Sequence, residues 1–594
     1  MKQFLKQTIS STIGTFLGLG IFLVLGAGGI LLIIAILANQ QQVSIKDKSI
    51  LVFDLSDVVQ DAHSSKSIAQ TITSRNDRQT LALQQVLEAI NRAVQDNKIK
   101  AIFLDGRNSK NTNGYSNLSE IRIALEKFKK QGKKVIAYAN NWDEKSYYLA
   151  STADQIIVNP LGTLEINGLV SEPLFFAGAL KKYGIGVQII RVGSFKSAVE
   201  PYIRSNLSSQ NRQQLQELLG NIWDNFITSV SQSRQIDIAH LKSISNNIGI
   251  LNAQQAKQEK LVDSIAYYDQ VVTELKKISN TNEKSYSPID LSDYLATNKT
   301  NNNLRKVNKI ALVYAEGTIT DGQGSADEVG GEKFSKELRN IRNDDDVKAV
   351  VLRINSPGGS ATASDIILRE IQLLGQKKPV VISMGNVAAS GGYWIATGGQ
   401  YIFANNDTIT GSIGVFGMLF NLQKLANNNG LTWDVVKTGK LADISSSSRP
   451  KTEKEIDLYQ RDVNRIYDLF IDKVSSARHL NVNRVKSIAQ GRVWSGYQAQ
   501  KIGLVDQIGG LEAAIQYAAK LAKIDANWKI EEHPQENSWR SILLDQFSKT
   551  QDAISNEDLL IEQWNNFKKQ LNFINKLNDP NGVYLLFPYE LNIN

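Results

Sequence analysis

Residues 347–384 read VKAVVLRINSPGGSATASDIILREIQLLGQKKPVVISM. The stretch opens with a largely apolar run over 347–354, which predicts a buried strand. Apolar residues at helical spacing follow over 364–374, and a second apolar run over 380–384 predicts the next strand. Buried strands that alternate with helices pair in parallel, so this stretch predicts an α/β fold built as a β-α-β spiral.

The same unit occurs twice in the chain. Six segments of the second half have counterparts in the first half, in the same order: DKSILVF (47–53) and NKIALVY (308–314), IKAIFLDG (99–106) and VKAVVLRI (347–354), KVIAYAN (134–140) and VVISMGN (380–386), YYLAS (147–151) and YWIAT (393–397), IWDNFITSVSQSR (222–234) and IYDLFIDKVSSAR (466–478), KLVD (260–263) and GLVD (503–506). Chance explains one such match, but six in order indicate a tandem duplication.

The chain has 594 residues, which is too many for one hydrophobic core. Composition and repeats divide it into five parts: an N-terminal arm and anchor (1–46), a first half (47–278), an Asn- and Ser-rich linker (279–306), a second half (307–530) and a C-terminal extension (531–594). We expect the extension to pack on the body or on an oligomer neighbour. No chemistry is apparent in its sequence.

The stretch 13–38 reads IGTFLGLGIFLVLGAGGILLIIAILA and carries no charge. It is long enough to cross a bilayer, and it exceeds the apolar core of a secretory signal. We therefore expect a retained single-pass anchor in membrane lipid rather than a cleaved signal. Lysines flank the run on both sides, so the positive-inside rule gives almost no preference for either orientation. The short arm before the span favours a cytoplasmic arm, with the bulk of the chain on the extracytoplasmic side.

Composition excludes several classes of site. The chain has no cysteine, which rules out disulfides, thiolate zinc sites and a cysteine nucleophile. Its four histidines lie far apart and form no metal-binding pattern, so no metal and no cofactor are predicted. The formal net charge is +8, and basic and acidic residues alternate along the chain. No nucleic-acid partner is therefore expected.

Two glycine-containing stretches follow neighbouring strands. NSPGG (355–359) follows the first strand, and NVAASGGY (386–393) follows the second. Each alone fits a simple packing turn. Together they favour a nucleophilic serine, Ser390, beside backbone amides that hold an oxyanion, with Gly391 able to offer one of them. A serine needs a base, and a buried lysine with a lowered pKa can serve, but composition does not select which lysine.

Four motifs resemble those of the signal peptide peptidase A family, also called protease IV. They are SPGG (356–359), AASGGYWIA (388–396), TGSIGV (410–415) and GSFKSAVEPYIR (193–204), and NDPNGVY (578–584) also fits that family. The resemblance implies two fused halves of the ClpP/crotonase fold and a Ser–Lys dyad. It makes Ser390 the nucleophile, Lys196 the general base, Ser412 the serine that orients the lysine, and Gly359 and Gly391 the backbone oxyanion donors.

The resemblance also implies a function. It predicts a membrane-bound serine endopeptidase that degrades cleaved signal peptides or other membrane-associated peptides, and that forms homo-oligomers. Its place would be the cell membrane, or an internal photosynthetic-type membrane where one exists. Two alternatives stay open at this point: an acyl-CoA enzyme of the crotonase type, and an inactive membrane scaffold.

The internal repeat supports the split site independently. Ser390 aligns with Glu144, Lys196 aligns with Ala442, and NSPGG aligns with RNSKN (107–111). The second half has thus kept the serine and the glycines, whereas the first half has kept the lysine. One ancestral Ser–Lys site that was duplicated and then divided between the halves would leave this pattern.

Overall fold

The computed structural model describes residues 14, 45–62, 79–108, 111–281, 285–297, 308–524, 528–534, 578–579 and 582–587. Apart from Gly14, the predicted membrane span (13–38) lies outside these residues. Among the helices that the structure describes, none combines the length and apolar character needed to cross a membrane.

A parallel six-stranded sheet forms the centre of the first half. Its strand order is β10 (Ser264–Ile265), β6 (Gln155–Val158), β5 (Lys134–Ala139), β4 (Ile99–Gly106), β1 (Ser49–Asp54) and β11 (Pro288–Asp290). Helices α3 (Leu83–Gln95) and α4 (Tyr115–Lys130) pack on one face, and α11 (Tyr268–Ser279) packs on the other. Because both faces are covered, the strands are largely apolar. The strand β11 comes from the segment predicted as the linker.

The second half repeats this plan. The main path of its sheet runs β21 (Val493–Ser495), β19 (Ile409–Gly411), β17 (Val380–Ala389), β15 (Val347–Ser356), β12 (Asn308–Glu316) and β23 (Trp528–His533), and β18 (Tyr401–Ala404) and β22 (Gln507–Ile508) pair beside it. Helices α13 (Gly331–Asn343) and α14 (Ala361–Gly375) cover one face and α20 (Leu511–Leu521) covers the other. The predicted strand, helix and strand within 347–384 are confirmed.

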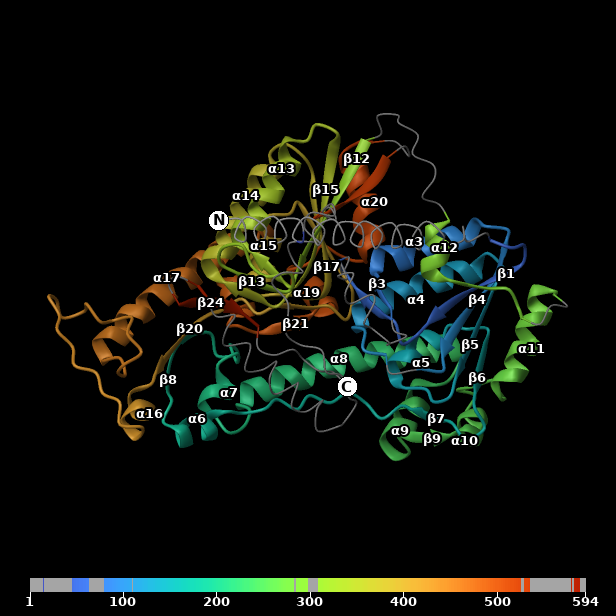
Figure 1. The fold of residues 1–594 in the computed structure, drawn as a ribbon, viewed down its shortest axis with the longest axis horizontal. Helices are drawn as coiled ribbons and strands as arrows, with labels where there is room; N and C mark the ends of the chain where they lie inside the picture. The colour runs from blue at the N-terminus through green and yellow to red at the C-terminus, as the bar shows by residue number, and fades with distance from the viewer. Residues whose placement is uncertain are drawn as a thin grey trace, which may run out of the picture.

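Matching elements confirm that the chain is duplicated. Each half carries a short helix after its third matched strand, α5 (Glu144–Ala150) in the first and α15 (Gly391–Ala396) in the second. Each also carries a helix of 26 residues, α8 (Ser209–Arg234) and α17 (Glu453–Arg478). In Figure 1 the sheet of the first half and that of the second lie side by side, with α8 running below both.

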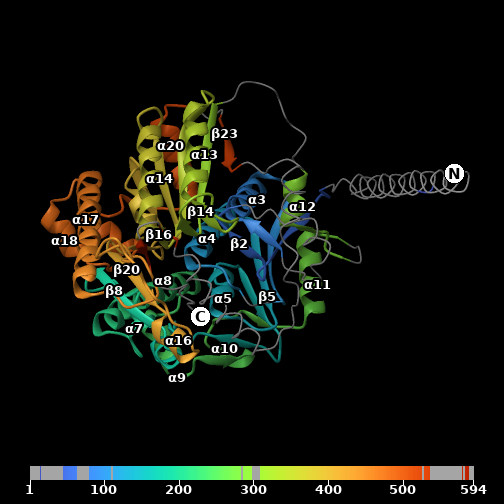
Figure 2. The same ribbon diagram turned by 60° about the vertical axis from the view of Figure 1, so that its left-hand side comes forward.

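A third sheet joins the two halves. Its order is β14 (Glu328–Gly330), β13 (Thr318–Thr320), β16 (Gly358–Ser360), β24 (Val583–Leu586), β20 (Val415–Asn421) and β8 (Gly186–Val192). Strand β8 belongs to the first half, and it pairs antiparallel with β20 of the second half from Val192 to Gly186. Figure 2 shows β8 and β20 lying together. This pairing brings the segment that follows β8 to the second half.

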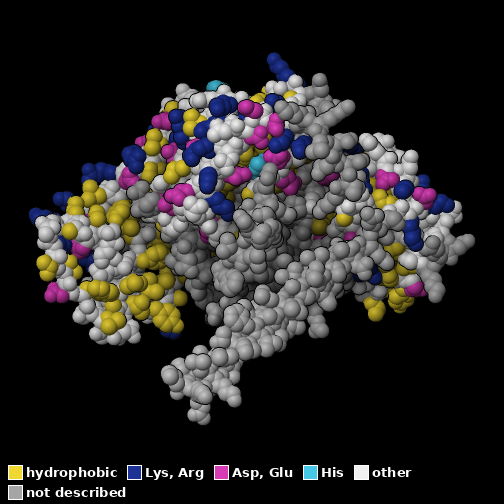
Figure 3. Space-filling view, turned by 45° about the horizontal axis from the view of Figure 1, so that its top comes forward, with side chains coloured by type: hydrophobic (Ala, Val, Ile, Leu, Met, Phe, Trp, Pro, Cys, Tyr) yellow, Lys and Arg dark blue, Asp and Glu magenta, His cyan; other side chains and the backbone are white. Residues whose placement is uncertain are grey.

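The surface carries charges of both signs. Figure 3 shows basic and acidic side chains interspersed over one face, with hydrophobic side chains gathered toward one end. An exposed segment between α16 (Gln423–Asn428) and α17 contributes several exposed apolar residues: Leu431, Trp433, Val435, Val436 and Leu441.

Candidate active site

Ser390 lies at the junction of β17 and α15, directly before the first turn of the helix. Its φ is +54°, a value that non-glycine residues rarely adopt and that costs about 1–3 kcal/mol. The backbone N–H of Ser390 donates to the Gly411 carbonyl at 2.8 Å, which helps to hold this conformation. The side chain is fully buried. A strained turn of this kind presents a hydroxyl at a helix N-terminus, where negative charge is stabilised.

Lys196 follows β8, and the second half encloses it. The Phe195 N–H donates to the Gln490 carbonyl at 2.9 Å, which ties the lysine loop to the segment before β21. A side-chain carbon on Gly491 would lie 2.6 Å from the Lys196 backbone nitrogen, and one on Gly414 would lie 3.2 Å from its Cδ. Lys196 is therefore completely buried, and burial lowers its pKa well below the usual value because the charged form loses its hydration.

Three oxygens surround the Lys196 amine. The Nζ atom lies 2.7 Å from the Ser390 Oγ, 3.0 Å from the Ser412 Oγ and 3.1 Å from the Ser412 carbonyl oxygen. A neutral amine has two N–H donors and one lone pair, so it can donate both protons to Ser412 while it accepts the Ser390 hydroxyl proton. Ser412 follows β19 with a φ of +50°, and its N–H donates to the Arg492 carbonyl at 2.8 Å.

The two predicted oxyanion glycines lie close together beside Ser390. Gly391 is the first residue of α15, and Gly359 is the central residue of β16. A side-chain carbon on Gly391 would lie 3.1 Å from the Gly358 Cα. On Gly359 such a carbon would overlap the Ile319 carbonyl oxygen, so only glycine fits there. The structure thus gathers all five predicted residues, Ser390, Lys196, Ser412, Gly359 and Gly391, into one buried site.

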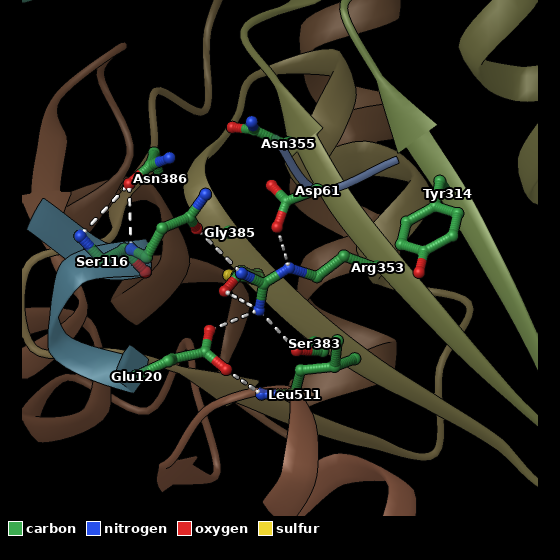
Figure 4. A network of polar contacts seen from close by, with 12 residues as sticks. Asp61, Ser116, Glu120, Tyr314, Arg353, Asn355, Ser383, Gly385, Asn386 and Leu511 are labelled. Carbon is green, nitrogen blue, oxygen red and sulfur yellow. Dashed lines mark hydrogen bonds and ion pairs between the residues drawn. The ribbon is translucent and has the colours of Figure 1, made fainter. Parts of the chain in front are cut away.

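A buried charge cluster that the motifs do not indicate links the two halves. Arg353 lies on β15 of the second half and is fully buried. Its Nε atom lies 2.8 Å from the Asp61 Oδ1, and its Nη1 atom lies 2.8 Å from the Glu120 Oε1, both in the first half. Figure 4 shows the guanidinium between these carboxylates. The signal available in the sequence is one arginine in the middle of a largely apolar strand.

Two asparagines extend this network to the ends of β15 and β17. The Asn355 Oδ1 accepts the Val387 N–H at 3.1 Å, which joins the two strands where their pairing is irregular. The Asn386 Oδ1 accepts the Ser116 N–H of α4 at 3.1 Å (Figure 4). Both asparagines belong to the motifs that carry the predicted site residues. Asn355 thus holds the strand segment before Ser390 within the second half, and Asn386 links that segment to the first half.

The first half keeps a changed version of the serine position. Glu144, the counterpart of Ser390 in the alignment, is the first residue of α5, whereas Ser390 directly precedes α15. The Glu144 Oε1 accepts the N–H groups of Asn167 and Gly168 at 2.7 and 2.8 Å. Burial raises the Glu144 pKa to about 7. Ala442, the counterpart of Lys196 in the alignment, lies on an exposed segment. Within the described residues, no cluster of His, Asp and Glu could hold a metal ion.

Two protein-family models match the chain. The model for peptidase family S49 matches twice, over residues 127–282 and 372–525, once in each half. The model for Clp protease matches residues 301–406, which include the NSPGG and AASGG motifs.

Several curated proteins of similar sequence are named as proteases. The chain is 37% identical over 530 residues to "Protease 4" of Haemophilus influenzae, covering 84% of each chain. It is 33% identical to "Protease 4" of Salmonella typhi over 95% of this chain and 93% of that one. It is 34% identical to "Serine protease SPPA, chloroplastic" of Arabidopsis thaliana over 76% of this chain and 67% of that one. The chain therefore belongs to peptidase family S49, and it is a serine peptidase with a ClpP-like α/β fold in two halves.

Proposed function

We propose that the peptidase works through a dyad in which Ser390 is the nucleophile and Lys196 is the general base. One observation carries this proposal: the Lys196 Nζ lies 2.7 Å from the Ser390 Oγ, within reach for proton transfer. The two residues come from different halves and are both fully buried. Burial lowers the pKa of the lysine amine and so favours its neutral form, and only the neutral amine can accept a proton.

The proposed reaction follows from these positions. Lys196 takes the hydroxyl proton as Ser390 attacks a peptide carbonyl, and the N–H groups of Gly359 and Gly391 stabilise the oxyanion. Lys196 then gives the proton to the leaving amine, and an acyl-serine remains. A water molecule releases the acid, with Lys196 again acting as the base. Ser412 accepts the two lysine N–H groups and directs the lone pair at Ser390.

We also propose the place and the substrates of the enzyme. Residues 13–38 would anchor it in membrane lipid as a single-pass protein with its body outside the cytoplasm, and the substrates would be cleaved signal peptides or other membrane-associated peptides. The same proposal includes the formation of homo-oligomers. It also includes the division of the chain into five parts, with boundaries after residues 46, 278, 306 and 530. Intact mass of the membrane-extracted protein tests the anchor, because a cleaved segment would be missing.

Activity-based labelling tests the dyad. A fluorophosphonate should modify Ser390, as mapped by peptide mass spectrometry, and the Lys196→Met variant should lose labelling and peptide hydrolysis by at least about 10³-fold. Lys378→Met is the matched control, because Lys378 is also a buried lysine with a lowered pKa but binds the carbonyl oxygen of Ile341. Equal losses in both variants, or label on another serine, would contradict the proposal.

A further inference from the structure

The strand β24 occupies a distinctive place in the third sheet. It pairs antiparallel with both β16 and β20. The other partner of β16 is β13, and the other partner of β20 is β8. Without β24, the strands β16 and β20 would face each other with unpaired edges across the width of one strand. Open edges of this kind bind extended peptides through main-chain hydrogen bonds.

The register of β24 places a carbonyl group at the proposed oxyanion hole. Leu585 lies opposite Gly359 in the antiparallel ladder. A side-chain carbon on Gly358 would overlap the Leu585 carbonyl oxygen and lie 2.5 Å from the Gly391 nitrogen, and one on Gly391 would lie 3.0 Å from the same oxygen. The Leu585 carbonyl thus lies beside Gly358 and the proposed donor Gly391, and its residue is the ladder partner of the other proposed donor, Gly359, which is where the carbonyl of a bound peptide would have to be.

The side chains of β24 alternate between two apolar environments. Val583 and Leu585 belong to the core cluster of the second half, together with Ile190 and Val415. Tyr584 and Leu586 face the opposite side and belong to a smaller cluster with Ala198, Val199, Tyr202, Phe416 and Met418. Ala198 and Val199 follow closely after Lys196 in the chain. A peptide in this position would therefore be extended, with apolar side chains at successive positions.

Contacts at both ends hold β24 in place. Before the strand, the Asp579 carboxylate accepts the Ser360 hydroxyl at 2.6 Å, the Thr362 N–H at 3.0 Å and the Val583 N–H at 3.2 Å. After the strand, the Phe587 N–H donates to the Pro357 carbonyl at 2.7 Å. Ser390 and Lys196 are both 0% exposed in this arrangement. A substrate peptide cannot contact Ser390 while the site is closed in this way.

We infer that the gap between β16 and β20 is a groove for extended apolar peptides and that β24 is its resident occupant, which must leave before a substrate enters. The inference rests on the proposed function, because it takes Ser390 as the nucleophile. Occupancy by β24 weakens peptide binding. The apparent affinity equals the affinity of the open groove multiplied by the fraction of molecules in which the groove is open.

A reversible disulfide tests the inference in the full-length protein, since the chain has no cysteine of its own. Gly417 and Val583 lie opposite each other in the β20–β24 ladder, so the Gly417→Cys/Val583→Cys variant locks β24 in place when oxidised. The matched control is Val187→Cys/Phe420→Cys, which links β8 to β20 at another opposed pair and leaves β24 free. Phe416→Cys/Tyr584→Cys provides a second lock at the neighbouring register.

Two readouts are compared before and after reduction of the same sample. The first is hydrolysis of an apolar fluorogenic peptide. The second is binding of a fluorescein-labelled peptide with the sequence of residues 578–587 to the same variants carrying Ser390→Ala. We expect oxidation of the locks to lower both readouts at least tenfold, reduction to restore them, and the control to be unaffected.

The two readouts separate the two proposals. An oxidised lock that hydrolyses and binds peptides as well as the reduced protein would overturn the inference about β24. If binding follows the lock but hydrolysis survives Ser390→Ala, the assignment of the nucleophile is wrong and the groove assignment stands.

Discussion

Replacing Arg353 with methionine tests how the two halves are held together. The side chains of Arg353, Asp61 and Glu120 are 0%, 1% and 3% exposed, so water cannot solvate the carboxylates when the guanidinium is removed. Breaking a buried ion pair by removing one partner costs about 3–5 kcal/mol, because the remaining charge is left without compensation. Here two carboxylates lose the same cation, and we expect a loss at the upper end of that range.

Urea unfolding followed by tryptophan fluorescence measures this loss, and peptide hydrolysis across the same urea series reports when the dyad separates. We expect the first transition of Arg353→Met to move to lower urea, together with the loss of activity, since the lysine and the serine come from different halves. Adding Asp61→Asn and Glu120→Gln should recover part of the stability, because these side chains leave no unpaired charge.

Arg339→Met is the control for this experiment. Arg339 is 52% exposed and contacts Glu370, which keeps a second partner in Arg342. Partly exposed pairs contribute about 0–1 kcal/mol, so this variant should unfold almost as the wild type does. If Arg353→Met is also within about 1 kcal/mol of the wild type, the buried cluster does not hold the halves together and the reasoning fails.

Further predictions concern the lysine. In the wild type the rate should fall as the pH drops through the lowered pKa of Lys196, because protonation removes the base; a pH profile that stays flat through acid pH would argue against it. The folded state binds this proton less well than the unfolded state, so its stability should rise with pH up to about 10.4, the ordinary lysine value. Lys196→Met removes that dependence, and its stability relative to the wild type, measured by urea unfolding, should decline from pH 7 to pH 10. Gly491→Ala should lose most of the peptidase activity, because the added carbon would lie 2.6 Å from the Lys196 backbone, whereas Gly430→Ala, with a similar φ and open space around it, should retain it.

Local sequence patterns and motifs predicted most of the fold and the candidate site. Alternating apolar strands and amphipathic helices predicted the β-α-β units, because burial on both faces of a parallel sheet requires apolar strands. Ser390 and Gly391 were indicated by a short motif at a strand end, whereas Lys196, Ser412 and the role of Gly359 came from the family resemblance. The structure brings Lys196 and Ser390 together through the β8–β20 pairing, and the sequence contains no direct signal of that pairing because it joins segments more than 200 residues apart.

Other features depend on tertiary packing and were not predictable from short segments. The extension after residue 530 showed no chemistry in its sequence, yet β24 lies beside Gly359 and Gly391. Four residues of an apolar strand carry no sign of which edge they will pair with. The contacts between Arg353 and the first half are likewise set by how the halves pack. A single arginine in an apolar strand indicates a partner without identifying it.

The division of the site between the halves has a chemical consequence. Lys196 owes its lowered pKa to burial, and much of that burial comes from the second half, through the segments around Gly414 and Gly491. A first half without its partner would leave the amine in water, where it stays protonated at neutral pH and cannot act as a base. The second half alone would hold Ser390 without a base. The packing of the halves therefore brings the two groups together and also lowers the lysine pKa as the proposed role of base requires, so a chain with unpaired halves would lack the proposed dyad.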